Sequence, residues 1–554
     1  MAVLNQKLIS IETYLDRVRG MWVGKFIGGT LGAPIEGIKD RHSFTPGDLR
    51  PELAENDDTD LQILWLHALE EHGPGLTSDD MIREWLEHYP APWAEYGVMR
   101  ANWQSGLKPP ETGRHNNWFY HAGMGCPIRS EIWGAVCPGA PELAAKYAEQ
   151  DGVLDHTGDA VEAEKFLAAM DASIFVEDDL SRLLDIGQSV VDPESEFYDL
   201  VVTVRQWAVE YDWETCRRRI LNRFGHPEMT HVLQNLGFVI LGLIQGEGDF
   251  ESTICKAINC GYDSDCTAAS AGAIIGGLLG FSGLPSHLRD AVPGEYQLSK
   301  FMVGFPREGS LDALCNSCGY WAQKVIAYHQ SDIELEGEYS HEPIAVEAQK
   351  LPSVLADQPD HPNWSLVGPF FRPWDERFQQ NEKYPDHGLA TMPSIAYFAH
   401  NDSGIDTDYL DGEGAFDLAA LLALPCDLKH TEKALDDRLP LGSLDTSLDR
   451  PWVGYAYTEF ELPESIDLWL MFGSSGPFRV FLDGKCVLKS DSYQPLTPVS
   501  FAVEQRFVKG DHRLLIKFAS TSNQPVLYFA LKEHDGMHWH QKPFYLKTIW
   551  KNDF

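Results

Sequence analysis

Apolar residues recur every three or four positions through most of the chain from residue 9 to about residue 330. This period matches one face of an α-helix, and few stretches in this part alternate with period two. Several of the periodic segments have Gly or Pro near their ends, where helices stop. The clearest predicted helices are 61–72, 161–172, 199–211, 229–243 and 267–279. We therefore expect residues 1–330 to form one large all-α domain.

The pattern changes after residues 331–360, a polar stretch rich in Glu, Pro and His that we interpret as a linker or wrapped connector. Beyond it, short β-prone runs alternate with turn residues, and Asp483–Gly484 is a strong hairpin signal. A second strand–turn–strand pattern surrounds residues 509–511, and segment 364–370 is typical of an edge strand that ends at proline. The sequence thus predicts a multidomain α + β protein whose residues 361–554 form a β-sandwich.

Composition narrows the possible partners. The 554 residues include 83 acidic and 44 basic side chains, a formal net charge of −39. Such a surface repels phosphate backbones and anionic headgroups, so we expect no nucleic acid and no membrane as partner. The N-terminal residues lack the compact apolar core of a secretory signal. The ten cysteines include one CxxC pair, Cys315 and Cys318, and form no disulfide framework or complete zinc motif. We expect a cytoplasmic protein with free thiols.

Two acidic clusters about 205 positions apart carry the strongest chemical signal. Residues 56–60 (NDDTD) precede an amphipathic run, and residues 261–267 (GYDSDCT) precede a run of small residues. A single carboxylate caps a helix start, but adjacent carboxylates repel one another unless a cation neutralises them. Together the clusters would offer the oxygen ligands that Mg²⁺, Mn²⁺ or Ca²⁺ prefers. The spacing alone leaves helix capping and metal binding about equally open.

Glycines at four-residue spacing mark a third segment, residues 21–37, which contains Gly24, Gly28 and Gly32. Gly and Ala allow another helix to approach closely, and the run after Asp265 is also rich in them. We expect close helix packing, which could hold the two acidic clusters together. Packing does not explain Glu36, a single acid after the apolar stretch.

These segments together resemble the ADP-ribosylglycohydrolase family, which includes the hydrolase that reactivates dinitrogenase reductase and the ADP-ribosyl-acceptor hydrolases. The resemblance rests on the Gly-rich segment ending in Glu36, on NDDT at 56–59 and on GYDSDCT at 261–267. Segments 123–129 (GMGCPIR) and 155–163 (DHTGDAVEA) are similar to the family's Gly-rich substrate loop and to a helix start. The resemblance implies an all-α domain with a binuclear Mg²⁺ or Mn²⁺ centre in a cleft.

The resemblance also implies roles for individual residues. The metal ligands would be Asn56, Asp57, Asp58, Asp263 and Asp265. The catalytic candidates are Glu36, which would position or deprotonate a water, and Asp58 or Asp263 as alternatives. Gly123 and Gly125 would line the part of the cleft that holds a diphosphate. His156 would contact the substrate or serve as a core histidine, and the two roles are about equally open.

Two positions depart from the family pattern, which usually has Thr or Ser at both. Asn56 precedes the paired aspartates, and Cys266 follows Asp265. Asn still offers a carbonyl oxygen, whereas a soft cysteine sulfur is a poor ligand for Mg²⁺. The centre is therefore expected to hold two ions, or one if a site is altered.

The strand-rich half is similar, over about residues 360–540, to galactose-binding-like jelly-roll domains appended to bacterial carbohydrate enzymes. The segments WSLVGPF and VKGDHRLLIKF carry this resemblance. Such domains often bind sugar, and many only pack against the catalytic domain. Four aromatic residues are candidates for sugar stacking, although core packing is the favoured role for most: Trp452, Tyr455, Tyr457 and Trp469.

The implied function is metal-dependent hydrolysis of a glycosidic bond at an anomeric carbon. Positive charge develops there in the transition state, which suits a carboxylate-rich pocket. The expected partner is a small-molecule sugar or ADP-ribose-type substrate. Two alternatives stay open: a glycoside or nucleoside hydrolase of carbohydrate metabolism, and a non-catalytic sugar- or nucleotide-binding protein. The sequence leaves the oligomeric state open.

Overall fold

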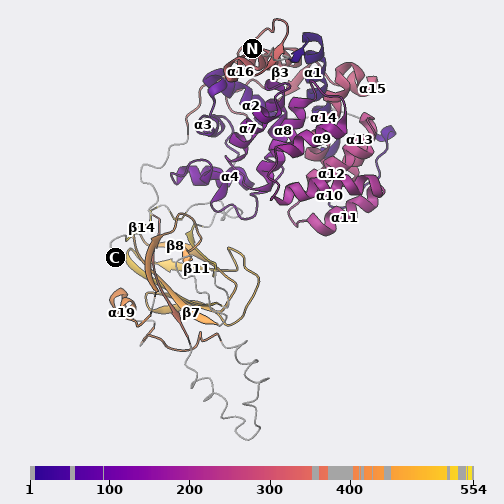
Figure 1. Cartoon of the computed structure of the whole chain (residues 1–554). Coiled ribbons are helices and arrows are strands. Elements are labelled where there is room, and N and C mark those ends of the chain that lie inside the picture. Colours follow the sequence, from indigo (N-terminus) through magenta and orange to yellow (C-terminus); the bar gives the residue numbers. More distant parts are fainter. Residues whose placement is uncertain are drawn as a thin grey trace, which may run out of the picture. The chain divides into compact units, whose positions relative to one another are not determined.

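The chain folds into two compact units, one helical and one strand-rich (Figure 1). The computed structural model describes residues 7–49, 57–91, 93–351, 361–371, 403–410, 412–413, 417–426, 428–441, 451–520, 525–533, 544–545 and 547–551. The helical unit comprises Met1–Trp103 and Leu107–Ser353, and the strand-rich unit comprises Gln104–Gly106 and Val354–Phe554. A helical domain followed by antiparallel sheets is the fold class that the sequence predicts.

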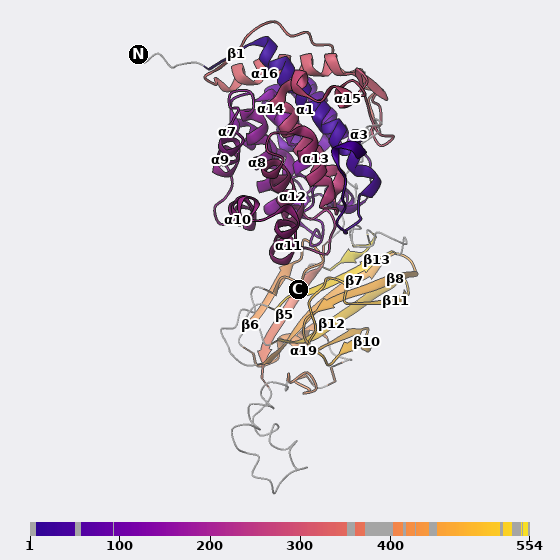
Figure 2. The same ribbon diagram turned by 90° about the vertical axis from the view of Figure 1, so that its right-hand side faces the viewer.

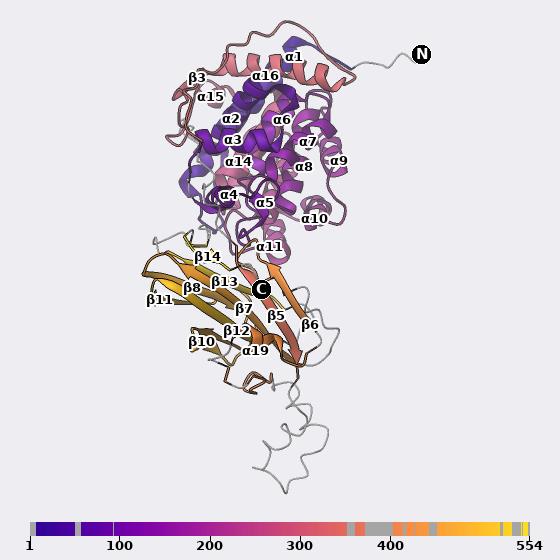
Figure 3. The ribbon, with the colours of Figure 1, turned by 90° about the vertical axis from the view of Figure 1, so that its left-hand side faces the viewer.

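The helical unit contains α-helices of 4 to 22 residues (Figures 2 and 3). Its α-helices are α1 (Ile11–Gly32), α2 (Asp57–His72), α3 (Ser78–His88), α4 (Ala94–Gln104), α5 (Glu111–Arg114), α6 (Ser130–Val136), α7 (Pro141–Gly152), α8 (Asp159–Ser173), α9 (Leu180–Ser189), α10 (Glu196–Glu210), α11 (Trp213–Phe224), α12 (Val232–Gln245), α13 (Phe250–Asn259), α14 (Ser264–Gly283), α15 (Ser286–Arg289) and α16 (Leu311–His329). Short 3₁₀ turns are η1 (Ala33–Ile35), η2 (Pro46–Asp48), η3 (Gly73–Gly75) and η4 (Pro127–Arg129). All five segments predicted as helices fall largely within α2, α8, α10, α12 and α14.

Helices α1 and α14 pack antiparallel at very short distance. The pairs in contact are Gly20 with Gly276, Gly24 with Gly272, Gly28 with Ala268, and Gly32 with Ser264. A Cβ atom added to Gly24 would lie 2.0 Å from the carbonyl oxygen of Gly272, and one added to Gly28 would lie 2.0 Å from that of Ala268. Only glycine fits at these α1 positions, so the four-residue spacing is confirmed as a helix-packing stripe.

Part of the predicted connector is wrapped onto the helical unit. Strand β4 (Ile333–Leu335) pairs in parallel with β1 (Lys7–Ile9). Further along, the Ile344 N–H donates to the Glu70 carboxylate at 3.0 Å, and the Glu347 N–H donates to the Gly304 carbonyl at 2.9 Å. A small antiparallel pair, β2 (Glu295–Gln297) with β3 (Glu308–Ser310), also belongs to this unit.

The strand-rich unit consists of two antiparallel sheets that share a hydrophobic core (Figures 2 and 3). The larger sheet has the order β10-β9-β12-β7-β5-β6, with β14 also paired to β7, and the smaller has the order β11-β8-β13. The strands are β5 (Asn363–Phe370), β6 (Leu428–Lys433), β7 (Trp452–Leu462), β8 (Ile466–Ser474), β9 (Phe478–Leu482), β10 (Lys485–Ser490), β11 (Phe501–Phe507), β12 (Gly510–Ser520), β13 (Leu527–Lys532) and β14 (Ile549–Trp550). Phe472 of β8 packs on Phe478 of β9 across the core, with ring centroids 4.5 Å apart. This is the arrangement of a β-sandwich.

The two turn signals have different outcomes. Asp483 and Gly484 have φ angles of 50° and 84°, as a tight two-residue hairpin requires, and they join β9 to β10 as predicted. The turn at residues 509–511 joins β11 to β12, but these strands belong to different sheets. The second signal therefore marks a crossing between the layers of the sandwich rather than a hairpin.

The prediction that residues 364–370 form an edge strand is wrong. Strand β5 lies between β6 and β7, where it pairs with both. Proline lacks the N–H that a central strand needs. Pro369 is tolerated because the pairing with β6 ends at Gly368 and the register with β7 shifts between Val367 and Phe370.

Most of the candidate sugar-stacking residues belong to cores. Trp452, Tyr455 and Tyr457 are at most 1% exposed. Trp469 is half-buried and packs against the hydrophobic core that the two sheets share. A small helix, α19 (Leu418–Leu422), supplies Leu421 to a second hydrophobic cluster around Tyr455 and Tyr457. Trp452, Tyr455 and Tyr457 therefore pack in hydrophobic cores, as favoured by the sequence analysis.

Helix α14 is long and apolar enough to cross a membrane by length and composition, but 67% of that window is buried within the protein. A core helix of a soluble protein has the same character.

All ten cysteines are free, and eight of them are buried.

Candidate metal and substrate site

Carboxylates of the two acidic clusters meet where two helices begin. Helix α2 begins at Asp57, and Asp263 directly precedes α14. The side chains of Asp58 and Asp263 are buried, each 1% exposed. The Cys266 thiol donates a hydrogen bond to Asp58 Oδ1 at 3.3 Å, which links the starts of α2 and α14 directly.

The close packing of α1 on α14 brings Glu36 to the same place. Glu36 follows α1 and η1, and it is exposed. A Cβ atom added to Gly32 would lie 2.2 Å from the carbonyl oxygen of Ser264, so the two helix ends are in backbone contact. The Gly37 N–H donates to the Tyr262 carbonyl at 2.8 Å, which ties the segment after α1 to the segment before α14.

The electrostatics of Asp265 show how crowded these carboxylates are. Burial raises the pKa of Asp265 well above its ordinary value, and the negative charges of Asp263, Asp58 and Glu36 raise it further. Ligand atoms of Asp263, Asp265 and Cys266 lie within 4.8 Å of one another. We call Asp58, Asp263, Asp265 and Glu36 the carboxylate site.

The donor set of the carboxylate site fits a hard divalent cation. Asp265 Oδ1 is buried and has no hydrogen-bond partner among the described residues. Carboxylate oxygens are the ligands that Mg²⁺ and Mn²⁺ prefer, and a cation would relieve their mutual repulsion. The Cys266 thiol already donates to Asp58 Oδ1, so its place in the structure is that of a hydrogen-bond donor.

Two of the predicted ligands have no described side chain. Asn56 lies outside the described residues, and for Asp57 the structure describes only the backbone that begins α2. Their contribution to a metal centre stays a prediction.

A buried lysine lies close enough to the carboxylate site to interact with its negative charge. Lys25 Nζ donates to Glu131 Oε1 at 2.9 Å and to the Ile128 carbonyl at 3.0 Å. Burial lowers the pKa of Lys25, but the charges of Glu131 and Asp58 outweigh it, so the net pKa is raised. Gln62 Nε2 completes the network by donating to Glu131 Oε2 at 2.8 Å. A charged ammonium group thus offsets part of the buried negative charge.

The loop of residues 123–125, the Gly loop, is connected to the carboxylate site through residues 229–235. Gly123 forms a β-bridge with His231. Asn235 Nδ2 donates to the Met229 carbonyl at 2.8 Å, while its Oδ1 accepts from the Asp263 N–H at 3.4 Å. One segment therefore contacts both parts of the site that the resemblance implies.

His156 lies behind the Gly loop and has no exposed surface. Its Nδ1 is 2.8 Å from Asp155 Oδ1, and its Nε2 is 3.7 Å from Glu95 Oε1. A Cβ atom added to Gly123 would lie 3.3 Å from His156 Nε2. This placement is that of a core histidine that backs the loop, and contact of His156 with a substrate stays a prediction.

The family model named ADP-ribosylglycohydrolase matches residues 10–315. The chain belongs to the ADP-ribosylglycohydrolase family. Among solved structures, one titled "ADP-ribosylglycohydrolase-related protein complex" is 20% identical, with a TM-score of 0.38, and the match covers 51% of this chain and 94% of that one. A β-glucosidase from Kluyveromyces marxianus in complex with glucose is 11% identical over 19% of this chain and 14% of that one, with a TM-score of 0.17. A search of curated proteins gives no match.

Sequence reasoning missed Glu95, a buried acid of this ADP-ribosylglycohydrolase-family domain. A Cβ atom added to Gly125 would lie 2.2 Å from Glu95 Oε1, so the carboxyl directly supports the Gly loop. Burial, followed by the charge of Asp155, raises the pKa of Glu95 to about 8. The carboxyl is therefore mostly protonated at neutral pH. A lone Glu near a helix start gives no signal of this, because the burial comes from distant segments.

Replacing Glu95 by glutamine is expected to remove part of the pH dependence of stability. The folded protein keeps the Glu95 proton up to about pH 8, whereas the unfolded chain releases it near the ordinary value of 4.5. The folded state binds more protons in this window, so stability falls as the pH rises through it, by about 1.4 kcal/mol per unit of pKa difference. Urea unfolding of wild type and Glu95→Gln should agree near about pH 5 and diverge near about pH 9, with the variant more stable. The exposed Glu149→Gln serves as control, and parallel curves for Glu95→Gln and wild type would contradict the prediction.

Proposed function

We propose that this protein is a metal-dependent hydrolase that cleaves a glycosidic bond at the anomeric carbon of an ADP-ribosyl or related ribosyl or sugar substrate. The family is one of glycosyl hydrolases, which supports the reaction class. The observation that carries the proposal is the convergence of Asp58, Asp263 and Asp265 with Glu36 beside them.

Asp58, Asp263 and Asp265 would hold Mg²⁺ or Mn²⁺, with Asn56 and Asp57 as further expected ligands of one or two ions. Such an ion, when bound, supplies Lewis-acid activation of a water and fixes the hydroxyls of the sugar.

Glu36 is the residue of the carboxylate site best placed for proton transfer. It is exposed while the three aspartates are buried, so its carboxylate can meet a water or a substrate. In our proposal this carboxylate accepts the proton of the attacking water. The buried aspartates keep the site negative, which stabilises the positive charge that develops on the anomeric carbon.

The Gly loop would receive the remainder of the substrate. The amides of Gly123 and Met124 already donate to the carbonyls of Tyr120 and Thr230, at 3.2 and 2.8 Å. Of the two predicted glycines, Gly125 is therefore the one we assign to amide binding of a diphosphate. A neutral Glu95 beside it supports this assignment, since a charged carboxylate would repel the anion.

Calorimetric titration of ADP-ribose, with Mg²⁺ and again with EDTA, tests this function. We expect binding with Mg²⁺ and none with EDTA. Binding that ignores EDTA would contradict the metal site. Absence of binding in both buffers would exclude the ADP-ribose substrate and favour a panel of glycosides and nucleosides, assayed with the same metals.

Substitution of Cys266 tests the metal shell independently of substrate. Cys266→Ala removes the hydrogen bond to Asp58 Oδ1 and is expected to weaken Mn²⁺ binding about tenfold, as the loss of a group that orients a ligand does. Cys266→Ser keeps a donor and should bind Mn²⁺ at least as well as wild type. Mn²⁺ titration by calorimetry measures both. Equal affinities of the alanine and serine variants would show that the thiol does not orient Asp58.

A further inference from the structure

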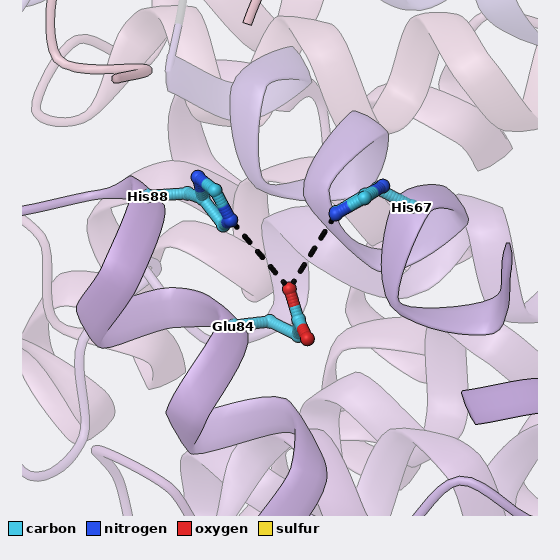
Figure 4. A group of neighbouring side chains, drawn as sticks. All are labelled: His67, Glu84 and His88. Atoms are coloured by element: carbon cyan, nitrogen blue, oxygen red, sulfur yellow. Dashed lines mark ion pairs between the residues drawn. The ribbon is translucent and has the colours of Figure 1, made fainter. Parts of the chain in front are cut away.

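A second group of potential metal ligands lies between helices α2 and α3. His67 is on α2, and Glu84 and His88 are four residues apart on one face of α3. All three side chains are buried. Figure 4 shows both imidazole rings directing one nitrogen at the same oxygen of Glu84.

The distances within this group match a shared ion better than direct hydrogen bonds. Glu84 Oε2 lies 3.6 Å from His67 Nε2 and 3.8 Å from His88 Nε2. Hydrogen bonds between nitrogen and oxygen are shorter, at about 2.7–3.2 Å. Two ligand atoms on one tetrahedral Zn²⁺, each bonded at about 2.1 Å, are about 3.4 Å apart. The three facing atoms lie within 4.8 Å of one another, so a small inward movement would close them on one ion.

The far side of each imidazole ring faces an acceptor. His88 Nδ1 lies 3.0 Å from the Val303 carbonyl. A carbonyl only accepts, so Nδ1 carries the proton and the Nε2 of the neutral ring presents its lone pair to Glu84. His67 Nδ1 faces Glu70 Oε2 at 3.6 Å. Metal-bound histidines usually donate their other N–H to a carbonyl or carboxylate, as His88 does here.

Glu84 is held in the same manner. His72 Nε2 contacts Glu84 Oε1 at 2.7 Å, which leaves Oε2 for the two buried rings. Phe305 packs edge-on against both His67 and His88, with ring centroids 5.3 Å apart in each case. A hydrophobic wall of this kind limits access of water to a metal site.

From this geometry we propose that His67, Glu84 and His88 form a second metal site, the His–Glu site, which binds one Zn²⁺ ion and ties α2 to α3. Glu87, whose Oε2 is 3.9 Å from His88 Nε2, or a water supplies the fourth ligand. Two imidazole nitrogens and one carboxylate favour Zn²⁺ over Mg²⁺.

The His–Glu site is distinct from the carboxylate site. His67 is nine residues beyond Asp58 on α2, a separation of about 13 Å at 1.5 Å per residue. Because α2 begins at the carboxylate site, an ion bound by His67 further along the helix would hold in place the helix that carries Asp58. The glycosidase chemistry proposed above has no step at the His–Glu site.

Titration of metal-free protein with Co²⁺, followed by visible absorption, tests the site. Four-coordinate Co²⁺ with nitrogen ligands absorbs far more strongly than Co²⁺ in an all-oxygen, six-coordinate site. We expect wild type and the carboxylate-site variant Asp265→Asn to bind one equivalent with this intense band and to release it when Zn²⁺ is added. Glu84→Gln and His88→Gln should bind at least about tenfold more weakly. Absence of the band in wild type, or its loss in Asp265→Asn with retention in His88→Gln, would overturn the proposal.

A measurement on wild type alone guards against variants that fail to fold. X-ray absorption at the zinc edge, on protein loaded with one equivalent of Zn²⁺, should show the scattering of two imidazole rings. A spectrum with oxygen ligands alone would place the ion elsewhere and overturn the His–Glu site. Two histidines beside Glu84 that bind no metal are the alternative, which predicts no Co²⁺ band and no zinc-bound imidazole.

Discussion

Replacing Gly28 by alanine is expected to lower the free energy of unfolding of the helical unit by about 2 kcal/mol or more. The added Cβ would lie 2.0 Å from the Ala268 carbonyl oxygen, 2.4 Å from its carbon and 2.8 Å from the Ala269 nitrogen. All three are backbone atoms of α14, so no side chain can rotate away. Overpacking costs about 3 kcal/mol in such cases, while alanine gains about 1 kcal/mol of helix propensity over glycine. The cost of the clash is therefore expected to exceed the gain in helix propensity, and the variant is expected to be less stable than wild type.

Gly294→Ala is the matched control for this prediction, since nothing lies within 4 Å of the Cβ it would add. Its effect should stay within about 0.5 kcal/mol of wild type. Urea unfolding followed by the helical circular dichroism signal measures both variants, because nearly all helical residues belong to the helical unit. Equal stability of Gly28→Ala and wild type would mean that α1 and α14 separate easily, and the positioning of Glu36 by this packing would lose its basis.

Much of the fold could be predicted because local patterns determine it. Helical period, glycine spacing and the Asp483–Gly484 turn act over a few residues, and the structure confirms each of them. The errors arise where partners are distant in sequence. The place of β5 between β6 and β7, and the separation of β11 from β12 into two sheets, depend on pairing across tens of residues. Pro369 lacks the N–H of a central strand and therefore favours an edge position when the sequence is considered alone. The structure places Pro369 where the pairing with both neighbouring strands is interrupted.

In the candidate site, too, local motifs could be predicted and contacts between distant residues could not. The acid clusters are visible as sequence motifs, and the structure brings Asp58, Asp263, Asp265 and Glu36 together. The groups that support or adjoin them give no local signal. Lys25 is the single charged residue of the apolar stretch 20–32 of α1, and its role becomes clear only from Glu131 and Asp58. Residues of the His–Glu site read as ordinary polar positions of two separate helices, and only their packing makes them a group.

Replacing Asp265 by asparagine is expected to have opposite effects on the metal-free and metal-bound protein. Without metal, the buried carboxylate is crowded by Asp263, Asp58 and Glu36, so a neutral side chain of the same shape should raise the melting temperature. With Mg²⁺ or Mn²⁺, the variant lacks a ligand, and its affinity should fall by about 100-fold or more. The rise in melting temperature that a ligand causes through binding the folded state should then disappear.

Asp60→Asn is the control for this experiment. Asp60 is buried in the same acidic cluster, but its Oδ1 accepts the Ser299 N–H at 2.9 Å, a bond that asparagine can keep. Thermal unfolding with EDTA and with Mn²⁺ should therefore show a metal-induced increase for wild type and Asp60→Asn and none for Asp265→Asn. Loss of metal-free stability in Asp265→Asn would argue that Asp265 serves the fold rather than a cation. An unchanged Mn²⁺ response in that variant would exclude Asp265 as a ligand, and with it the carboxylate site as the centre of hydrolysis.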